Sequence, residues 1–349
     1  MKKISCITLV ALLIISMFTA CASGNPSAPQ QTPGATESDD TTQPVELPTL
    51  ELWHYHTTAM EEAINNKVAE YNALPERKAN VNVQYIPREE LSKRYALGVA
   101  SGDLPQIAVI DNPESASYAS MGMFLDITDK VATLPNPNFL EGPINSGNYQ
   151  GKQYTMPIRS NCLALWSNDE MLAAAGVTKI PQTWDELLAA CETLQKTNPK
   201  VYPLSYCALK SEEGTFHLLP FLLSAGASWD SMDTPEAVNA LTMLKTLFDK
   251  KYVSPEVINW TQNDMEKQFA AGNTAMMING SWHIANMAKD APDLKYTINN
   301  IPKDKVYASV LGGENLGITI AAKDEFDAAW DFFSWFISLD ANITYNTSS

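Results

Sequence analysis

Along residues 48–341, short apolar runs alternate with longer stretches in which apolar residues recur at helical spacing. Residues 50–53, Leu-Glu-Leu-Trp, read as a first strand, residues 107–110 are a continuous apolar run, and residues 81–85 alternate between apolar and polar positions. The run at 107–110 lies between a proline and an aspartate, as expected of a parallel strand buried on both faces. Strands that alternate with helices in this way predict an α/β fold.

Helices are predicted by their apolar stripes and by residues that favour helix starts. Residues 60–71 and 89–100 have the apolar spacing of a helix. Residues 167–170 and 183–186 each have the composition of a capping box. Residues 234–235, Thr-Pro, supply an N-cap and a first-turn proline. The helix that follows is predicted to face the core with Val238, Leu241, Leu244 and Phe248.

The first 47 residues have a different character. Two lysines precede an apolar stretch over residues 4–18, and small residues then stand directly before Cys21. This order is typical of a secretory signal peptide, which we place at residues 1–20. Residues 21–47 are rich in Pro, Thr and Ser, so a disordered tether is predicted there. The alternative is a retained signal-anchor helix, although the apolar stretch is short for a hydrocarbon core of about 30 Å.

The charge of the chain excludes some partners. The chain has 24 Lys and Arg against 40 Asp and Glu, a net charge of -16. Such an excess argues against nucleic acid, because binding it depends on neutralising phosphates. It also argues against adhesion of the folded part to anionic lipid.

After Cys21 come only Cys162, Cys191 and Cys207, without Cys-x-x-Cys or Cys/His clustering, so no metal site and no cofactor are expected.

Five groups of residues carry a resemblance to a known family. The main segments of the five groups are, in order, SGDLPQIAV (101–109), GKQYTMP (151–157), PQTWDEL (181–187), FAAGNTAM with GSW (269–282), and GGENLGI (312–318). In this order they resemble the extracellular solute-binding proteins of bacterial ABC sugar importers, the group that includes maltose-binding protein. The segment that ends at Cys21 is similar to the lipobox of bacterial lipoproteins, with Phe18 where the family usually has Leu.

The resemblance implies a fold and a division of the chain. The fold would be α/β and periplasmic-binding-protein-like (type II), with two α/β lobes, crossing strands and a ligand cleft between the lobes. Lobe 1 would contain residues 48–157 and 306–341, and lobe 2 residues 158–305. One part of this expectation has independent support. α/β sheets bind ligands at the carboxyl ends of their strands, and polar and aromatic residues follow the predicted strands here.

Trp282 is the foremost candidate ligand contact. Sugars are recognised by aromatic rings on their apolar faces and by polar side chains on their hydroxyls. Trp282 follows a predicted strand and matches the family's Gly-x-Trp motif, whose Trp contacts the sugar; a core tryptophan is the alternative. Phe216 and Trp229 are further stacking candidates, again with core packing as the alternative.

Polar candidates lie at the ends of predicted strands and at the lobe crossings. His54, Tyr55 and His56 follow the first strand, and their alternative roles are a capping turn or, for the two histidines, a metal site that no nearby carboxylate or Cys completes. Asp111 and Asn112 follow the strand at 107–110, with a turn or helix cap as the alternative. The remaining candidates are Arg159, Asn161, Glu314 and Asn315, of which Asn161 matches a polar ligand contact of the family and Arg159 is chosen for its proximity.

The resemblance implies a receptor rather than an enzyme. Such a protein would be a monomer, anchored to the extracytoplasmic face of the cell membrane through lipid on Cys21, and would deliver a carbohydrate, expected to be an oligosaccharide, to an ABC permease. The alternatives are a surface-anchored glycan hydrolase and a sugar-sensing partner of a membrane kinase. A hydrolase is disfavoured because the chain has no recognisable catalytic motif.

The end of the chain departs from the family pattern. In the family the chain usually continues well past the helix that matches residues 328–338 and returns to the second lobe. Here residues 342–349 read as a polar tail. We therefore expect lobe 2 to lack the returning helices and to expose apolar surface.

Overall fold

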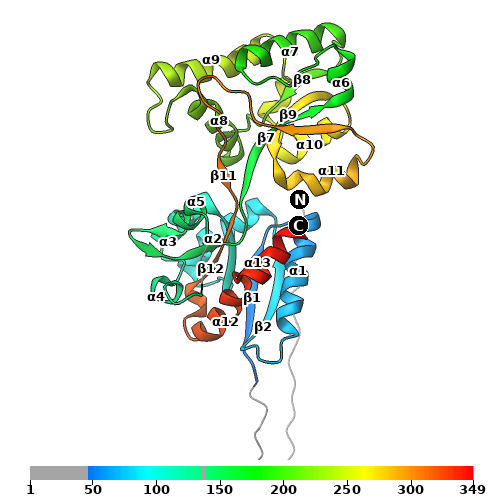
Figure 1. Ribbon diagram of the computed structural model, residues 1–349. Coiled ribbons are helices and arrows are strands. Elements are labelled where there is room, and N and C mark those ends of the chain that lie inside the picture. Colours follow the sequence, from blue (N-terminus) through cyan, green and yellow to red (C-terminus); the bar gives the residue numbers. More distant parts are fainter. Residues whose placement is uncertain (1–45, 136–138, 349) are drawn as a thin grey trace, which may run out of the picture. The chain divides into compact units, whose positions relative to one another are not determined.

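The computed structural model describes residues 46–135 and 139–348, which form two α/β lobes (Figure 1). The predicted signal peptide, the predicted tether up to residue 45 and Cys21 lie outside the described residues. Within the described ranges, none of the helices combines the length and the apolar character that crossing a bilayer requires. The predicted fold class is confirmed.

The first lobe is built on a five-stranded sheet in the order β2-β1-β3-β12-β6. β1 is parallel to β2 and β3, whereas β12 is antiparallel to its neighbours β3 and β6. Its strands are β1 (Thr49–His54), β2 (Asn80–Tyr85), β3 (Ile107–Asp111), β6 (Thr155–Pro157) and β12 (Glu314–Ile318). A short hairpin of β4 (Asn148–Tyr149) and β5 (Lys152–Gln153) precedes β6 in the sequence.

Helices cover both faces of this sheet, because its strands alternate buried side chains between two cores. Ile107 and Val109 pack with α1 (Thr58–Asn72) and α12 (Phe326–Phe336), while Ala108 and Ile110 pack with α2 (Arg88–Ser101) and α3 (Ser115–Ser120). Two further short helices are α4 (Thr128–Val131) and α5 (Glu141–Ser146). The strand at 107–110 is therefore buried on both faces, as its apolar run predicts.

The second lobe has its own sheet, in the order β10-β7-β9-β8. Its strands are β7 (Asn161–Asn168), β8 (Tyr202–Ser205), β9 (Thr274–Gly280) and β10 (Tyr296–Asn299). One face packs against α7 (Trp184–Thr197), α8 (Glu212–Ala225) and α9 (Pro235–Asp249), and the other against α10 (Gln262–Ala270) and α11 (Ile284–Asp290). α6 (Asp169–Ala174) follows β7 directly.

Two chain crossings join the lobes. The chain leaves the first sheet at the end of β6 and enters the second at the start of β7; it returns through β11 (Leu311–Gly312), which pairs with β7, and continues as β12. Gly313, between β11 and β12, has φ of +134°, and a side chain there would lie 2.1 Å from the Arg159 carbonyl oxygen. The return crossing therefore requires glycine.

The lobe boundary on the return path differs from the predicted one. Residues after 306 still contact the second lobe, because the Val306 nitrogen donates to the Ser224 carbonyl and the Ser309 hydroxyl donates to the Leu163 carbonyl at 2.8 Å. The crossing lies at Gly313 rather than at residue 306.

Two helix predictions need correction. α9 buries Ala237, Ala240, Met243 and Leu247, whereas the predicted inward residues Val238, Leu241 and Phe248 are exposed. Alanines let α9 approach α8 closely. The face of α9 that carries the alanines therefore packs inward, instead of the face that carries the larger apolar residues. The start of α6 is capped by Asn168, which accepts from the Met171 nitrogen, rather than by Ser167, which is the buried penultimate residue of β7.

The predicted polar tail is a helix. α13 (Leu339–Thr347) packs on the first lobe, with Tyr345 fully buried against Phe336. The buried residues of α13 are Ala341 and Tyr345, so the helix has an inward-facing side although most of its residues are polar. On α9, in the second lobe, Val238, Leu241 and Phe248 are exposed. That the second lobe lacks returning helices stays a prediction.

Candidate ligand-binding site

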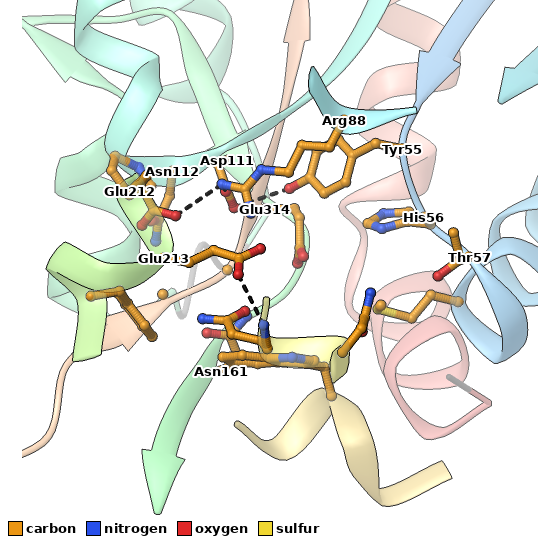
Figure 2. A pocket seen from close by; sticks show the side chains of 18 of the residues that line it. Tyr55, His56, Thr57, Arg88, Asp111, Asn112, Asn161, Glu212, Glu213 and Glu314 are labelled. Carbon is orange, nitrogen blue, oxygen red and sulfur yellow. Dashed lines mark hydrogen bonds and ion pairs between the residues drawn. The ribbon is translucent and has the colours of Figure 1, made fainter. Parts of the chain in front are cut away.

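A cavity of about 260 Å³ lies where the two lobes meet at the crossings. It is slightly smaller than the roughly 300–1,000 Å³ typical of small-molecule pockets. Figure 2 shows side chains of both lobes pointing into this space. The polar and aromatic residues that line it are Tyr55, His56, Thr57, Tyr85, Arg88, Asp111, Asn112, Asn161, Glu212, Glu213, Phe216, Gln262, Asn263, Trp282 and Glu314.

The first-lobe wall is formed by residues at the carboxyl ends of three parallel strands. Tyr55 follows β1, Arg88 opens the helix after β2, and Asp111 ends β3. Parallel strands bring these ends to one edge of the sheet, which explains why residues far apart in sequence meet here.

An ion-pair network holds this wall together. Arg88 pairs with the Asp111 carboxylate, and the Tyr55 hydroxyl donates to Asp111 Oδ1 at 3.0 Å. The Arg88 guanidinium also lies 5.6 Å from the centre of the Tyr55 ring. Burial alone would lower the pKa of Arg88, but the nearby Asp111, Tyr55 and Glu212 raise it overall, so Arg88 stays charged.

Aromatic residues dominate part of the second-lobe wall. Trp282 lies in a short 3-10 helix, η3 (Ser281–His283), that follows β9, and its ring centre is 6.3 Å from that of Phe216 on α8. A side chain at Gly280 would come within 2.0 Å of the Trp282 ring, so this glycine lets the ring lie against the backbone. Trp282 is thus held in one orientation beside the cavity.

Glu314 at the return crossing is the most perturbed acid of the site. Its side chain is 6% exposed, and its Oε2 atom has no hydrogen-bond partner among the described residues. Burial, reinforced by Asp111, raises the pKa of Glu314 to about 7, against the opposing effect of Arg159 and Arg88. Glu314 and Asp111 are directly paired across β12 and β3, so their carboxylates lie on the same face of the sheet.

His54, which ends β1, and His56, which follows it, are uncharged. Burial lowers the pKa of His54 to about 4 and that of His56 to about 3. His54 Nδ1 accepts a hydrogen bond from the His56 backbone nitrogen, and His56 Nε2 lies 3.1 Å from the Tyr345 hydroxyl. The His54 side chain therefore holds the turn that follows β1, and of the two histidines only His56 lines the cavity.

Most of the predicted site residues come together at this cavity. Those that line it are Tyr55, His56, Asp111, Asn112, Asn161, Phe216, Trp282 and Glu314, and their contact with a ligand is still a prediction. His54 and Asn315 lie in the core behind it, where the Asn315 amide contacts the hydroxyls of Ser115, Ser146 and Thr155. Arg159 is not among the lining residues but affects the pKa of Glu314 from the first crossing.

Trp229 does not reach the cavity. Its side chain is 72% exposed on the connection between α8 and α9. The prediction that it is a stacking platform does not fit this cavity, because Trp229 is not among the lining residues.

Three charged residues of the site were not predicted. Arg88 follows the end of β2, so the strand-end rule that selected Asp111 could have found it. Glu212 and Glu213 lie in the first turn of α8, where acidic residues are common in any helix. Only the packing of the two lobes brings these glutamates opposite Arg88.

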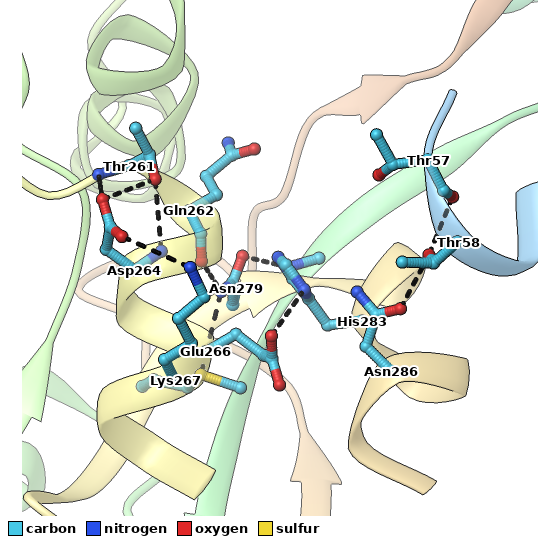
Figure 3. A network of polar contacts seen from close by, with 12 residues as sticks. Thr57, Thr58, Thr261, Gln262, Asp264, Glu266, Lys267, Asn279, His283 and Asn286 are labelled. Atoms are coloured by element: carbon cyan, nitrogen blue, oxygen red, sulfur yellow. Dashed lines mark hydrogen bonds and ion pairs between the residues drawn. The ribbon is translucent and has the colours of Figure 1, made fainter. Parts of the chain in front are cut away.

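Polar contacts join the lobes beside the cavity. Arg88 on α2 also pairs with Glu212 on α8 at 3.0 Å, across the cleft. Figure 3 shows a second link, in which the Thr58 hydroxyl at the start of α1 donates to Asn286 Oδ1 on α11 at 2.9 Å. The same view shows Asn279, whose amide donates to the Gln262 carbonyl and so ties the start of α10 to β9.

The fold and this site define a two-lobed ligand-binding protein with its site at the lobe crossings. Residues 57–343 match the model of the bacterial extracellular solute-binding protein family, and the chain belongs to that family.

Solved structures and curated relatives agree with this assignment. The chain is similar to an ABC transporter solute-binding protein from Thermotoga lettingae bound to α-D-tagatose, with 25% identity, a TM-score of 0.77, and coverage of 86% of this chain and 79% of that one. It is also similar to the cyclic α-maltosyl-1,6-maltose binding protein of Arthrobacter globiformis, with 26% identity, a TM-score of 0.72, and coverage of 87% and 78%.

Curated relatives are more distant and longer. A binding protein of Brucella abortus is 21% identical over 64% of this chain, and the diacetylchitobiose binding protein DasA of Streptomyces coelicolor is 23% identical over 75%. The chain spans 55% and 63% of these two relatives.

Proposed function

We propose that this protein captures a carbohydrate between its lobes and delivers it to an ABC importer. The observation that carries the proposal is the composition of the cavity, whose lining combines Trp282 with carboxylates and amides from both lobes. An aromatic face suits the apolar face of a sugar ring, and carboxylates accept hydrogen bonds from its hydroxyls. The tagatose-bound structure and the cyclic α-maltosyl-1,6-maltose binding protein described above support the same ligand class.

Calorimetric titration of the purified protein with a panel of mono- and oligosaccharides tests the proposal. At least one sugar should bind saturably with a 1:1 stoichiometry and raise the melting temperature. The absence of saturable binding across the panel would overturn it.

The cellular setting is part of the proposal. Cleavage before Cys21 and lipid on its sulfur would hold a monomer on the extracytoplasmic face of the cell membrane, beside its permease subunits. Metabolic labelling with palmitate should label the wild type and not the Cys21→Ser variant. Equal labelling of both proteins would exclude this anchor.

Measurements of sugar uptake distinguish a permease partner from a sensor-kinase partner. If the protein serves transport, deleting its gene should abolish uptake of the bound sugar while the response of sugar-controlled genes persists once the sugar enters by another route. Loss of the transcriptional response with normal uptake would favour the sensing alternative.

The hydrolase alternative has one observation in its favour. Glu314 and Asp111 are paired carboxylates, and one of them has a raised pKa, as glycoside hydrolysis requires. However, both Asp111 oxygens are already engaged, one by Tyr55 and the other by Arg88. We therefore propose capture without turnover, and incubation with labelled glycans should leave them uncleaved at equimolar protein.

A further inference from the structure

The cavity has an excess of negative charge. Its lining contains four carboxylates, those of Asp111, Glu212, Glu213 and Glu314, and a single guanidinium, that of Arg88. Arg88 is shared between Asp111 and Glu212, so it neutralises at most one of the two. A neutral sugar that closed this cleft would leave the remaining charge buried without compensation, which is unfavourable.

Glu314 is the group that most needs a partner. It is more than nine-tenths buried, and its Oε2 atom is hidden from solvent and has no hydrogen-bond partner among the described residues. Figure 2 shows the Glu314 carboxylate between Glu213 and His56, and Glu314 is one of the residues that line the cavity. Among the described residues no ion pair joins Glu314 to Arg159, a cation outside the lining that lowers the pKa of Glu314. A donor supplied by the ligand would therefore complete this site.

The opposite wall suits a cation as well. Trp282 and Phe216 present ring faces and edges beside the carboxylates, and a cation over an aromatic face is attracted by the negative charge of that face. Carboxylates with aromatic rings are a donor set for an organic ammonium group rather than for a bare metal ion, which prefers several oxygen ligands.

We propose that the ligand is an amino sugar whose free ammonium group pairs with Glu314 and the neighbouring carboxylates. This inference rests on the proposed carbohydrate function and narrows it to a cationic class of sugar. The sugar ring would lie against Trp282, and the ammonium group would approach the Glu314 carboxylate from the cavity that both residues line.

Matched sugars that differ only at carbon 2 test this proposal. Glucosamine, N-acetylglucosamine and glucose, the same triple in the galacto and manno series, and the disaccharides chitobiose, diacetylchitobiose and cellobiose are titrated by calorimetry at pH 7. At least one amino sugar should bind about tenfold or more tightly than both of its neutral counterparts.

Variants assign the preference to the site. Glu314→Gln should reduce the ratio of amino-sugar to neutral-sugar affinity to within about twofold. Glu236→Gln, which removes an exposed acid of α9 paired with Lys305, should leave the ratio unchanged. A wild type that binds neutral sugars as tightly as amino sugars would overturn the inference and preserve the proposed function. A wild type that binds no sugar at all would overturn both.

Discussion

At the scale of single residues, the site depends on two side chains held in unusual surroundings. Trp282 lies against backbone that Gly280 leaves open, and Glu314 is buried beside a second carboxylate. Neither position can be recognised from composition, since most tryptophans are core residues and most glutamates are exposed. Trp282 was found through its motif and Glu314 through the glycine-rich segment in which it lies.

Removing the Trp282 ring should weaken ligand binding. Trp282→Ala is expected to lower sugar affinity at least about tenfold, because buried aromatic anchors carry a large share of binding energy, and Trp282→Phe should lose less. Trp229→Ala is the matched control, since Trp229 is 72% exposed away from the cavity. Calorimetry on the three variants, with melting temperatures as a check on folding, measures this; equal losses for Trp282→Ala and Trp229→Ala would contradict it.

Ionisation of Glu314 should make stability depend on pH. Its pKa is about 7 in the folded protein against an ordinary value of 4.5, so folding favours the protonated form. The stabilising contribution is complete below pH 4.5 and is lost as the pH rises through 7. The charged or titratable groups around it are Asp111, Arg88, Arg159, Tyr55 and Tyr345.

The Glu314→Gln variant isolates this contribution. Relative to the wild type, its free energy of unfolding should rise by up to about 3 kcal/mol between pH 4.5 and pH 8. Urea unfolding at both pH values provides the measurement, and Glu236→Gln, which removes an exposed acid whose pKa is lowered, should show no such gain. A constant difference between Glu314→Gln and the wild type would show that Glu314 is ionised throughout.

At the scale of elements, the lobes are linked by helix starts. Arg88 begins α2 and Glu212 begins α8, and their ion pair crosses the cleft. Thr58, which begins α1, has φ of +55°, a costly conformation for a β-branched residue, and it makes the other cross-lobe contact described above. Both links would be broken if the lobes moved apart.

Breaking the Arg88–Glu212 pair should favour a more open ligand-free protein. Because a half-exposed ion pair contributes about 0.2–1 kcal/mol, Glu212→Gln should shift the ratio of open to closed forms by roughly 1.5- to 5-fold. Small-angle X-ray scattering would show a larger radius of gyration that decreases again on adding ligand. Glu90→Gln removes a pair that lies entirely within α2, with Arg94, and should not change the radius; a change of equal size in both variants would refute the cross-lobe role.

The C-terminal helix α13 should contribute to the stability of the first lobe. Tyr345→Ala removes a fully buried ring that packs on Phe336 and is expected to cost about 3 kcal/mol of unfolding free energy. Ile343→Ala, on the exposed side of the same helix, should stay within about 0.5 kcal/mol of the wild type. Urea unfolding compares the two, and equal costs would show that α13 does not pack as described.

At the scale of the whole molecule, periodicity predicted which segments are strands and helices but not how they pack. The run at 107–110 specified its own burial, since both of its faces are apolar. The apolar stripe of α9 did not specify which face is buried, because α8 packs closely against the alanines of α9 instead. Likewise, the strand ends predicted the first-lobe half of the site, whereas Glu212 and Glu213 depend on how the second lobe docks.

The position of β12 has a consequence for the order of folding. This strand lies in the interior of the first sheet, between β3 and β6, yet it follows the whole second lobe in sequence. The second sheet is nearly contiguous in sequence, so it can form while the first still lacks an inner strand. During refolding followed by pulse-labelled hydrogen exchange, amides of β7 and β9 should gain protection before those of β12; simultaneous protection would oppose this order. A chain made from its N-terminus would thus keep its first lobe without an inner strand until residue 318 has left the ribosome.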